Sequence, residues 1–371
     1  MANVLLAGGG TAGHVNPLLA TAEELRARGH RVEALGTAEG LEQDLVPRAG
    51  LTLHVVPKAP MPRRPSGDLL RFPGRFASAV RAARRAIDES RADAVVGFGG
   101  YVSTPAYLAA RRARVPIIVH EANARPGMAN RLGSRMTDHV AVTFPETPLR
   151  HAQLTGLPLR AEIRDLAALL ADPRAAADAR EAARAVAGWP ADAPVLVITG
   201  GSLGAASLNA AAAGAVPRLI SHGVHVWHLT GAGKSDDAQR VYGDLTAAER
   251  PLYRVEEYSH DMGTVLAAAG AVVCRAGAAT VSELTALGLP AMYVPLPHGN
   301  GEQADNARPA VDAGAAIMLT DAELTPAMLE QRTEHMLLDD RAATAMREAA
   351  RDIGIRDGAD RVADMIEGAL R

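Results

Sequence analysis

NVLLAGGGTAG, residues 3–13, is the stretch that decides the fold, because a short apolar strand runs directly into glycines and then into an Ala- and Leu-rich segment. The same succession of strand, glycines and helix is predicted in the second half of the chain, where residues 195–204 are VLVITGGSLG. Glycine lets a ligand approach the backbone closely, and the helix that follows offers unpaired N–H groups to an anion. The sequence therefore predicts two anion-binding loops, one in each half.

Short β-branched runs alternate with amphipathic stretches on both sides of these loops, which predicts βαβ units and parallel sheets. This alternation is interrupted by a turn-rich stretch near residues 154–163, and the sequence predicts helix over residues 325–371. We expect an α/β protein with two Rossmann-like parallel-sheet domains facing a central cleft. The domains are predicted over residues 1–160 and 161–371. The last helix is a candidate to return to the first domain. The predicted strands are 4–7, 31–35, 95–97, 116–120, 195–199, 224–230, 252–256, 271–274, 291–295 and 315–319.

Composition excludes several classes of protein. The 371 residues are 48% hydrophobic and carry a formal net charge of −3, so bulk nucleic-acid binding through net charge is not expected. Cys274 is the one cysteine, which rules out an intrachain disulfide and a multi-cysteine zinc site. The N-terminus has no basic leader and no 18 apolar residues run uninterrupted, so neither a standard export signal nor a membrane span is predicted.

A nicotinamide dehydrogenase is one alternative, because residues 8–13 match G-x-G-x-x-G. That class needs an acid at the end of the second strand, about 20 residues further on, to hold the ribose hydroxyls. The predicted strand 31–35 ends in Gly36-Thr37, and its only acid, Glu33, lies in mid-strand. The dehydrogenase is therefore disfavoured.

An α/β-hydrolase is a second alternative, because residues 200–204 fit G-x-S-x-G, with Glu283 and His298 downstream as an acid and a histidine. That fold places its nucleophile inside one continuous sheet, whereas this motif opens a second series of strands. The hydrolase is the weaker rival.

No metal or other cofactor is predicted. His222, His225 and His228 are spaced by three, but the run around them is β-branched and apolar, so a strand would send these rings to opposite faces. The chain also has no D-x-D pair, a common signature of a metal-held nucleoside diphosphate. Any pyrophosphate must be bound by N–H groups, hydroxyls and cations of the protein.

Polar residues set among glycines follow further predicted strands, where ligand contacts are expected in open parallel sheets. The clusters are GFGGYVSTP at 97–105, HEAN at 120–123, CRAGAATVSE at 274–283 and PHGNGEQADN at 297–306.

As an ordered set, these motifs resemble the MurG-type bacterial glycosyltransferases, which add N-acetylglucosamine to the membrane-borne peptidoglycan precursor lipid I. The resemblance covers nearly the whole chain and implies the GT-B fold, UDP-N-acetylglucosamine as donor, and inverting transfer to a 4-hydroxyl to give a β-1,4 linkage. A different glycolipid or natural-product glycosyltransferase would share the architecture. The matching motifs are GGGTAGHVNP at 8–17, GFGGYVSTP at 97–105, HEANARPGMANR at 120–131, GLPLR at 156–160, GGSLGA at 200–205, CRAGAATVSEL at 274–284 and HGNGEQADNA at 298–307.

The resemblance places most donor contacts in the C-terminal domain. Ser202 and the N–H groups after Gly201 would bind the diphosphate, with Arg160 as a nearby cation. Thr280 would add a phosphate hydrogen bond, and Glu283 would accept hydrogen bonds from the ribose hydroxyls.

The base and the sugar of the donor have their own implied contacts. Backbone near Tyr258 and Ala278 would border the uracil, and Ala279 belongs to the same predicted site. Glu302 and Gln303 would reach the sugar hydroxyls, although the family often has two consecutive glutamines at this place.

The resemblance places the acceptor on the first loop. His14 is the candidate base that takes the proton from the 4-hydroxyl, and its alternative is to bind acceptor phosphate or the backbone. Thr11, Ala12 and Gly13 would contact the acceptor, and Ala12 stands where the family commonly has glycine. Asn123 matches a family asparagine that contacts the donor sugar or the acceptor.

A basic segment predicts attachment to a membrane. Residues 61–91 hold eight arginines against three acids, a local charge of +5. We expect Leu69 to Phe72 and the arginines to meet an anionic lipid surface, while Phe76, Val80, Ala83 and Ile87 form a stripe that faces the core. The predicted partners are thus UDP-N-acetylglucosamine, lipid I and anionic lipid but not nucleic acid, for a peripheral enzyme on the cytoplasmic side of the cell membrane.

Overall fold

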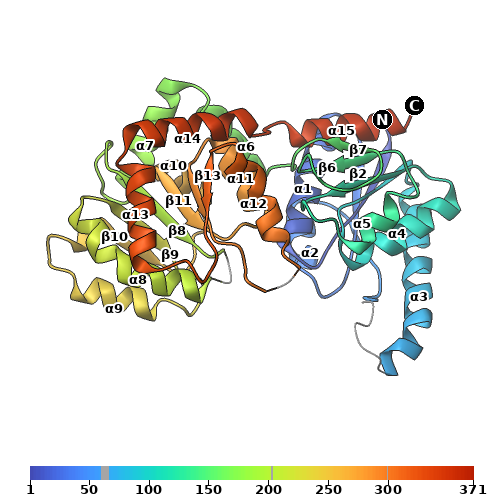
Figure 1. Cartoon of the computed structure of the whole chain (residues 1–371). Coiled ribbons are helices and arrows are strands. Elements are labelled where there is room, and N and C mark those ends of the chain that lie inside the picture. The colour runs from blue at the N-terminus through green and yellow to red at the C-terminus, as the bar shows by residue number, and fades with distance from the viewer. Residues whose placement is uncertain (60–66, 202–203, 299) are drawn as a thin grey trace. The chain divides into compact units, whose positions relative to one another are not determined.

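The computed structural model describes residues 1–59, 67–201, 204–298 and 300–371, with only the backbone over 67–70. The chain forms two compact units (Figure 1). Unit 1 comprises Met1–Arg160 and Ile355–Arg371, and unit 2 comprises Ala161–Gly354. The sequence placed residues 355–371 in the second domain, with the last helix as a candidate to return to the first; in the structure they belong to unit 1.

Unit 1 contains a seven-stranded parallel sheet in the order β3-β2-β1-β4-β5-β6-β7. Strand β1 lies at the point where the order reverses, and its carboxyl end leads into the first glycine loop. Ligands bind at such a reversal in doubly wound sheets. The strands are β1 Asn3–Ala7, β2 Arg31–Gly36, β3 Leu53–Val55, β4 Ala94–Gly97, β5 Ile117–Glu121, β6 Val140–Val142 and β7 Ala152–Leu154.

Unit 2 repeats the plan with six parallel strands in the order β10-β9-β8-β11-β12-β13. Here β8 holds the central place and leads into the second glycine loop. Two Rossmann-like parallel sheets, as the sequence predicted, are therefore confirmed. The strands are β8 Val195–Thr199, β9 His225–Leu229, β10 Tyr253–Glu256, β11 Ala271–Cys274, β12 Ala291–Tyr293 and β13 Ala316–Met318.

Helices cover these sheets and connect the parallel strands. Those of unit 1 are α1 Ala12–Ala27, α2 Glu42–Arg48, α3 Gly67–Ser90, α4 Gly100–Ala113, α5 Met128–Gly133 and α15 Gly358–Ala369. Those of unit 2 are α6 Ala161–Leu169, α7 Pro173–Val186, α8 Ala206–Ser221, α9 Asp236–Asp244, α10 Met262–Ala268, α11 Ala278–Leu287, α12 Glu302–Asp312, α13 Pro326–Leu337 and α14 Asp340–Ile353, with a 3₁₀ turn at Arg250–Leu252.

Helix α15 is the element that ties the end of the chain to unit 1 (Figure 1). Val362 and Ile366 are fully buried in the same apolar cluster as Leu25 of α1. Arg28, just after α1, donates hydrogen bonds to Glu24 at 2.7 Å and to Asp364 at 2.5 Å. Apolar contact thus fixes which face of α15 is buried, and the ion pair between Arg28 and Asp364 adds a polar link to α1.

Helix α3 carries the stripe that the sequence predicted. Val80, Ala83 and Ile87 are buried in the core of unit 1, and Phe76 packs against them partly buried. Leu69 and Leu70 lie outside the described side chains. No helix in the described ranges combines the length and the apolar character that crossing a bilayer requires.

Replacing Ile366 by alanine should destabilise unit 1 by about 2–5 kcal/mol, because a buried side chain is lost and its cavity cannot fully collapse. Calorimetric unfolding measures the loss. The two tryptophans, Trp189 and Trp227, both lie in unit 2, so their fluorescence should report a smaller shift. Arg361→Ala, at a half-exposed position of the same helix, is the control, and equal shifts in both variants would contradict the packing.

Candidate functional site

The first glycine loop joins β1 to α1 and needs its glycines for steric reasons. Gly10 has φ +88°, in the left-handed region. A Cβ on Gly9 would lie 2.3 Å from Oε1 of Glu42, and a Cβ on Gly100, whose φ is +76°, would lie 2.7 Å from the Gly9 carbonyl oxygen. The loop is therefore packed on one side by α2 and on another by the start of α4.

His14 lies in the first turn of α1 and is half-buried, and residues of the glycine loop contact its ring. Its Nδ1 is 3.1 Å from the Gly9 carbonyl oxygen and 3.2 Å from Thr11 Oγ1. A carbonyl only accepts, so the bond to Gly9 requires Nδ1 to carry the hydrogen. Nε2 then keeps its lone pair, and a histidine that acts as a general base accepts the proton at such a nitrogen.

The first residues of α1 present the predicted anion contacts. Thr11, at the N-cap, and Ala12 and Gly13 in the first turn are all exposed. N–H groups at this end of a helix lack intrahelical acceptors. The structure therefore places Thr11, Ala12, Gly13 and His14 together at one helix N-terminus.

Glu42, at the start of α2, is a residue that the sequence analysis missed. Its carboxylate is fully buried and accepts hydrogen bonds from Gly10 N at 2.9 Å, Thr37 N at 2.9 Å and Thr37 Oγ1 at 2.7 Å. Burial acts to raise the pKa of this carboxyl, but these hydrogen bonds outweigh it and hold the pKa below its ordinary value. The carboxylate is thus turned inward to the glycine loop and is not available to ribose hydroxyls.

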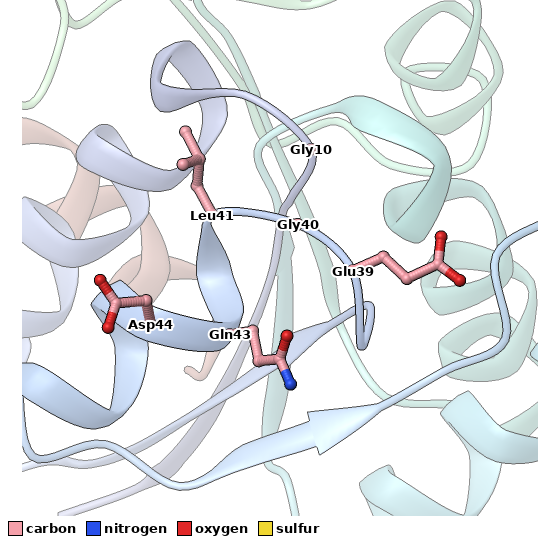
Figure 2. Close-up of a pocket in the computed structure, with 6 residues that line it drawn as sticks. All are labelled: Gly10, Glu39, Gly40, Leu41, Gln43 and Asp44. Atoms are coloured by element: carbon pink, nitrogen blue, oxygen red, sulfur yellow. The ribbon is translucent and has the colours of Figure 1, made fainter.

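A pocket opens on the outer side of the same segment (Figure 2). It has a volume of about 530 Å³ and is bordered by Gly10 and by residues 39–44 other than Glu42. Apart from the two chain neighbours of Gly10, no heavy atom of the described residues lies within 4 Å of the position that a Cβ on Gly10 would take, so this side of the loop is open.

Asn123 follows β5 in a loop that a buried carboxylate shapes. Glu121 Oε1 accepts from Asn123 N and Glu121 Oε2 accepts from Gly127 N, both at 3.0 Å. Asn130 Nδ2 also donates to Glu121 Oε2, and Tyr107 OH donates to Asn130 Oδ1 at 2.8 Å. This network, which sequence reasoning did not find, fixes the backbone that carries Asn123.

The same network reaches the neighbourhood of His14. A Cβ on Gly99 would lie 3.0 Å from Nε2 of His14 and 3.6 Å from Nδ2 of Asn130. Gly99 has φ +97°, so a side chain there would be strained as well as crowded. The end of β4 thus leaves space for the imidazole.

The second glycine loop follows β8 in unit 2. Thr199 Oγ1 accepts from Gly201 N at 3.1 Å, and a Cβ on Gly204 would lie 2.2 Å from the Thr230 carbonyl oxygen. Asn209 Nδ2, from α8, donates to the same Thr230 carbonyl at 2.9 Å and so holds the end of β9, against which Gly204 packs. Ser202 lies outside the described residues.

The other predicted donor contacts follow neighbouring parallel strands, whose carboxyl ends share one edge of the sheet. Ala278, Ala279, Thr280 and Glu283 form the first two turns of α11, after β11. Tyr258 follows β10, is 53% exposed and packs edge-on against His260.

Gln303 in α12 connects two of these loops. Its Oε1 accepts from Leu296 N at 2.9 Å and from Ala276 N at 3.3 Å. With the carbonyl end of the amide fixed in this way, its NH₂ group is the end that remains to donate. Glu302 precedes it as the first residue of α12, and Arg160, half-buried, ends the first segment of unit 1.

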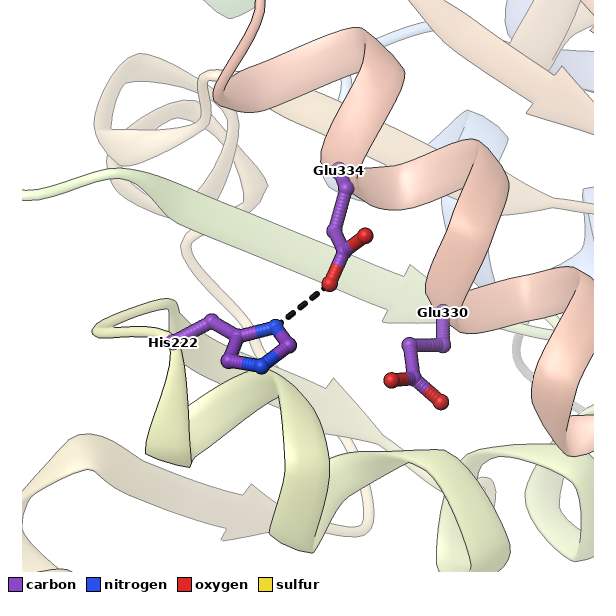
Figure 3. A group of neighbouring side chains, drawn as sticks. All are labelled: His222, Glu330 and Glu334. Carbon is purple, nitrogen blue, oxygen red and sulfur yellow. Dashed lines mark hydrogen bonds and ion pairs between the residues drawn. The ribbon is translucent and has the colours of Figure 1, made fainter.

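His222, Glu330 and Glu334 are a group in the described residues that could hold a metal ion (Figure 3). His222 follows α8 and bonds Glu334 of α13 through Nδ1 at 2.5 Å. Arg218 pairs with Glu330 at 3.4 Å. Both carboxylates thus have a cationic or hydrogen-bonding partner, which accounts for the cluster without an ion.

The other two histidines of the 222–228 run lie apart from this group. His225 packs edge-on against Trp189, with ring centroids 5.3 Å apart. His228 is fully buried, with Nδ1 2.9 Å from Tyr253 OH and Nε2 3.1 Å from Asn209 Oδ1. These two rings have different neighbours, as the strand pattern predicted.

Known structures and relatives identify the class of protein. The crystal structure of Acinetobacter baumannii MurG matches 99% of this chain and 100% of its own, with a TM-score of 0.76 and 29% identity. The fold is that of the two-domain GT-B glycosyltransferases.

Residues 4–142 match the glycosyltransferase family 28 N-terminal domain, and residues 195–362 match the C-terminal domain of that family. Two curated relatives carry the name UDP-N-acetylglucosamine--N-acetylmuramyl-(pentapeptide) pyrophosphoryl-undecaprenol N-acetylglucosamine transferase. The one from Paenarthrobacter aurescens is 47% identical and the one from Clavibacter sepedonicus 49%, each over 99% of this chain and 96% of the relative. The chain belongs to glycosyltransferase family 28, and the dehydrogenase and hydrolase alternatives are set aside.

Two buried imidazoles behind the site loops predict sensitivity to acid. Burial lowers the pKa of His120, which lies before the Asn123 loop, to about 4, against a smaller opposing effect of its bond to the Gly156 carbonyl. Burial likewise lowers the pKa of His228 to about 4. Below the unfolded pKa of 6.5 the unfolded chain binds protons that the folded imidazoles do not.

We therefore expect stability to fall as pH drops from 6.5 towards 4, by roughly 3 kcal/mol for each imidazole. Melting temperatures across this range measure it, and His228→Gln should flatten the dependence in unit 2. His151→Gln, at a half-exposed histidine, is the control. An unchanged slope in the His228 variant would contradict the assignment.

Proposed function

We propose that this chain transfers N-acetylglucosamine from UDP-N-acetylglucosamine to lipid I, forming a β-1,4 bond to the 4-hydroxyl of its muramyl sugar with inversion. The observation that carries the proposal is the near-full-length likeness to transferases whose name states this donor and acceptor. The helix N-terminus that carries His14 supports it, because that end of α1 offers both a base and N–H donors for an anion.

We propose that unit 2 binds the donor. The N–H groups of the second glycine loop, together with Ser202 and Thr280, would hold the diphosphate and stabilise it as it leaves. Arg160, the last residue of the first segment of unit 1, is the cation that we propose for the diphosphate. Glu283 would accept hydrogen bonds from the ribose, and the NH₂ group of Gln303 would donate to the sugar.

The remaining contacts of the proposed donor site are with the base and the sugar. Tyr258, Ala278 and Ala279 would border the uracil. Glu302, as a carboxylate, would accept hydrogen bonds from sugar hydroxyls where an amide could also donate.

We propose that unit 1 binds the acceptor and that His14 acts as the base. Thr11, Ala12 and Gly13 would bind the acceptor pyrophosphate, and Asn123 would contact a sugar. Nε2 of His14 takes the proton of the 4-hydroxyl, and the oxygen attacks the anomeric carbon from the face opposite UDP. The bond between that carbon and the diphosphate oxygen breaks, and UDP leaves with the electron pair.

A transfer assay with labelled UDP-N-acetylglucosamine tests the function. Lipid I should accept the sugar, and a simple glycolipid offered beside it should not. Preference for the simple glycolipid would favour the alternative glycosyltransferase. UDP should raise the melting temperature and NADH should not, because a ligand that binds only the folded state stabilises it. Protection by NADH alone would overturn the proposal.

His14→Ala should lower turnover by about 100-fold or more while keeping the UDP-induced rise in melting temperature, because the base is lost and unit 2 is untouched. His151→Ala, at a half-exposed histidine of the same unit, is the control. Full turnover of the His14 variant would refute its assignment as the base.

We propose that the enzyme attaches peripherally to the cytoplasmic face of the membrane through α3 and α4. A groove between these helices is lined by stacked Phe72 and Phe76, with Arg81, Arg84 and Arg112 beside them. An apolar groove bordered by arginines suits the boundary between lipid headgroups and acyl chains.

Replacing Arg81 and Arg112 together by alanine should weaken binding to vesicles that contain anionic phosphatidylglycerol by about 30-fold, since each basic residue near an anionic surface contributes on the order of 1 kcal/mol. Vesicle sedimentation measures the change. Arg240→Ala with Arg308→Ala, two exposed arginines of unit 2, is the matched control. Equal binding by both double variants would place the attachment elsewhere.

A further inference from the structure

The peptide group between Gly9 and Gly10 is hydrogen-bonded at both of its ends. Its N–H, which belongs to Gly10, donates to Glu42 Oε2 at 2.9 Å. Its carbonyl, which belongs to Gly9, lies 3.1 Å from His14 Nδ1 and accepts from that atom. A single planar group therefore links a buried carboxylate to the imidazole of the proposed base.

We propose that Glu42 is a positioning residue for His14, acting on the imidazole through the Gly9–Gly10 peptide group. This inference rests on the proposed function of His14 as the base. The order is carboxylate, peptide N–H, peptide carbonyl, Nδ1–H, and Nε2 at the far end is the nitrogen that takes the proton in the proposed reaction.

The chemistry of the step explains what the carboxylate contributes. When the 4-hydroxyl proton moves to Nε2, the ring becomes a cation and its Nδ1–H donates more strongly to the Gly9 carbonyl. A carboxylate that accepts from the N–H of the same peptide makes that carbonyl a better acceptor, because hydrogen bonds in a chain polarise one another. No proton moves other than the one transferred from the hydroxyl to Nε2.

The surroundings keep the carboxylate in place and charged. Thr37 donates to Oε1 through both its N–H and its hydroxyl, which leaves Oε2 for Gly10. A Cβ on Gly9 or Gly40 would lie within 2.3 Å of a Glu42 carboxylate oxygen, so glycines make the room for it. The carboxylate thus points to the peptide, and Glu42 does not border the pocket of Figure 2.

Glu42→Gln in the full chain tests the proposal. Glutamine has the same shape but no charge, and its NH₂ group must oppose either the Gly10 N–H or the Thr37 N–H. We expect kcat to fall about 10- to 100-fold with the acceptor KM within about twofold and the UDP-induced melting shift retained. The loss is smaller than for a carboxylate bonded directly to a histidine, because the Gly9 carbonyl still selects the tautomer.

Two further variants separate charge from loop packing. Arg48→Gln removes a charge from the same helix at an exposed position outside the pocket and should leave kcat unchanged. Thr37→Val removes one donor to Oε1 but keeps the carboxylate and its bond to Gly10, so kcat should stay within about threefold. If Thr37→Val lost as much kcat as Glu42→Gln, or if Glu42→Gln raised only the acceptor KM, the proposal would be overturned.

A spectroscopic measurement on the unaltered chain keeps the proposal testable even if Glu42→Gln does not fold. In protein with ¹⁵N-labelled histidine, assigned through the His14→Ala variant, the neutral His14 ring should be the Nδ1–H tautomer. The Nε2–H tautomer would overturn the proposal. Because this readout needs no acceptor, it separates failure of the inference from failure of the transferase assay.

Discussion

Parallel strand pairing is the constraint on which the site depends. Every strand of a parallel sheet delivers its carboxyl end to the same edge, so loops far apart in sequence become neighbours. In unit 1 the pairing of β1 with β4 brings the first glycine loop against Gly99 and Gly100. In unit 2 the pairing of β11 with β8 and β12 gathers the loops that begin at Gly200, Arg275 and Val294.

The two units stabilise their loops with different chemistry. Unit 1 uses buried carboxylates, Glu42 under the first glycine loop and Glu121 under the Asn123 loop. Unit 2 combines the hydroxyl of Thr199 and the amide of Gln303 with the guanidinium of Arg275, which donates to the Val294 carbonyl.

Much of the fold could be predicted from local sequence. The β-branched runs at 195–199 and 271–274 are strands with the predicted bounds, and the stripe on α3 faces the core. Short strands such as β3 and β6 were missed, because three residues carry too little periodicity to stand out. Helix α1 begins at Ala12, inside the glycine-rich stretch, although glycine has a low helix propensity.

The sequence by itself determined the two strand–glycine–helix segments and the position of His14 on one of them. It also determined the ordered motifs that indicate the family. All of these depend only on residues that are neighbours in the chain. Only the tertiary structure decided that Glu42 turns inward to Gly10, that Asn130 and Tyr107 support the Asn123 loop, and that 355–371 packs on unit 1. A glutamate at a helix start has the same local sequence whether its carboxylate faces solvent or a backbone N–H. The choice is made by the packing that removes it from water and supplies its donors.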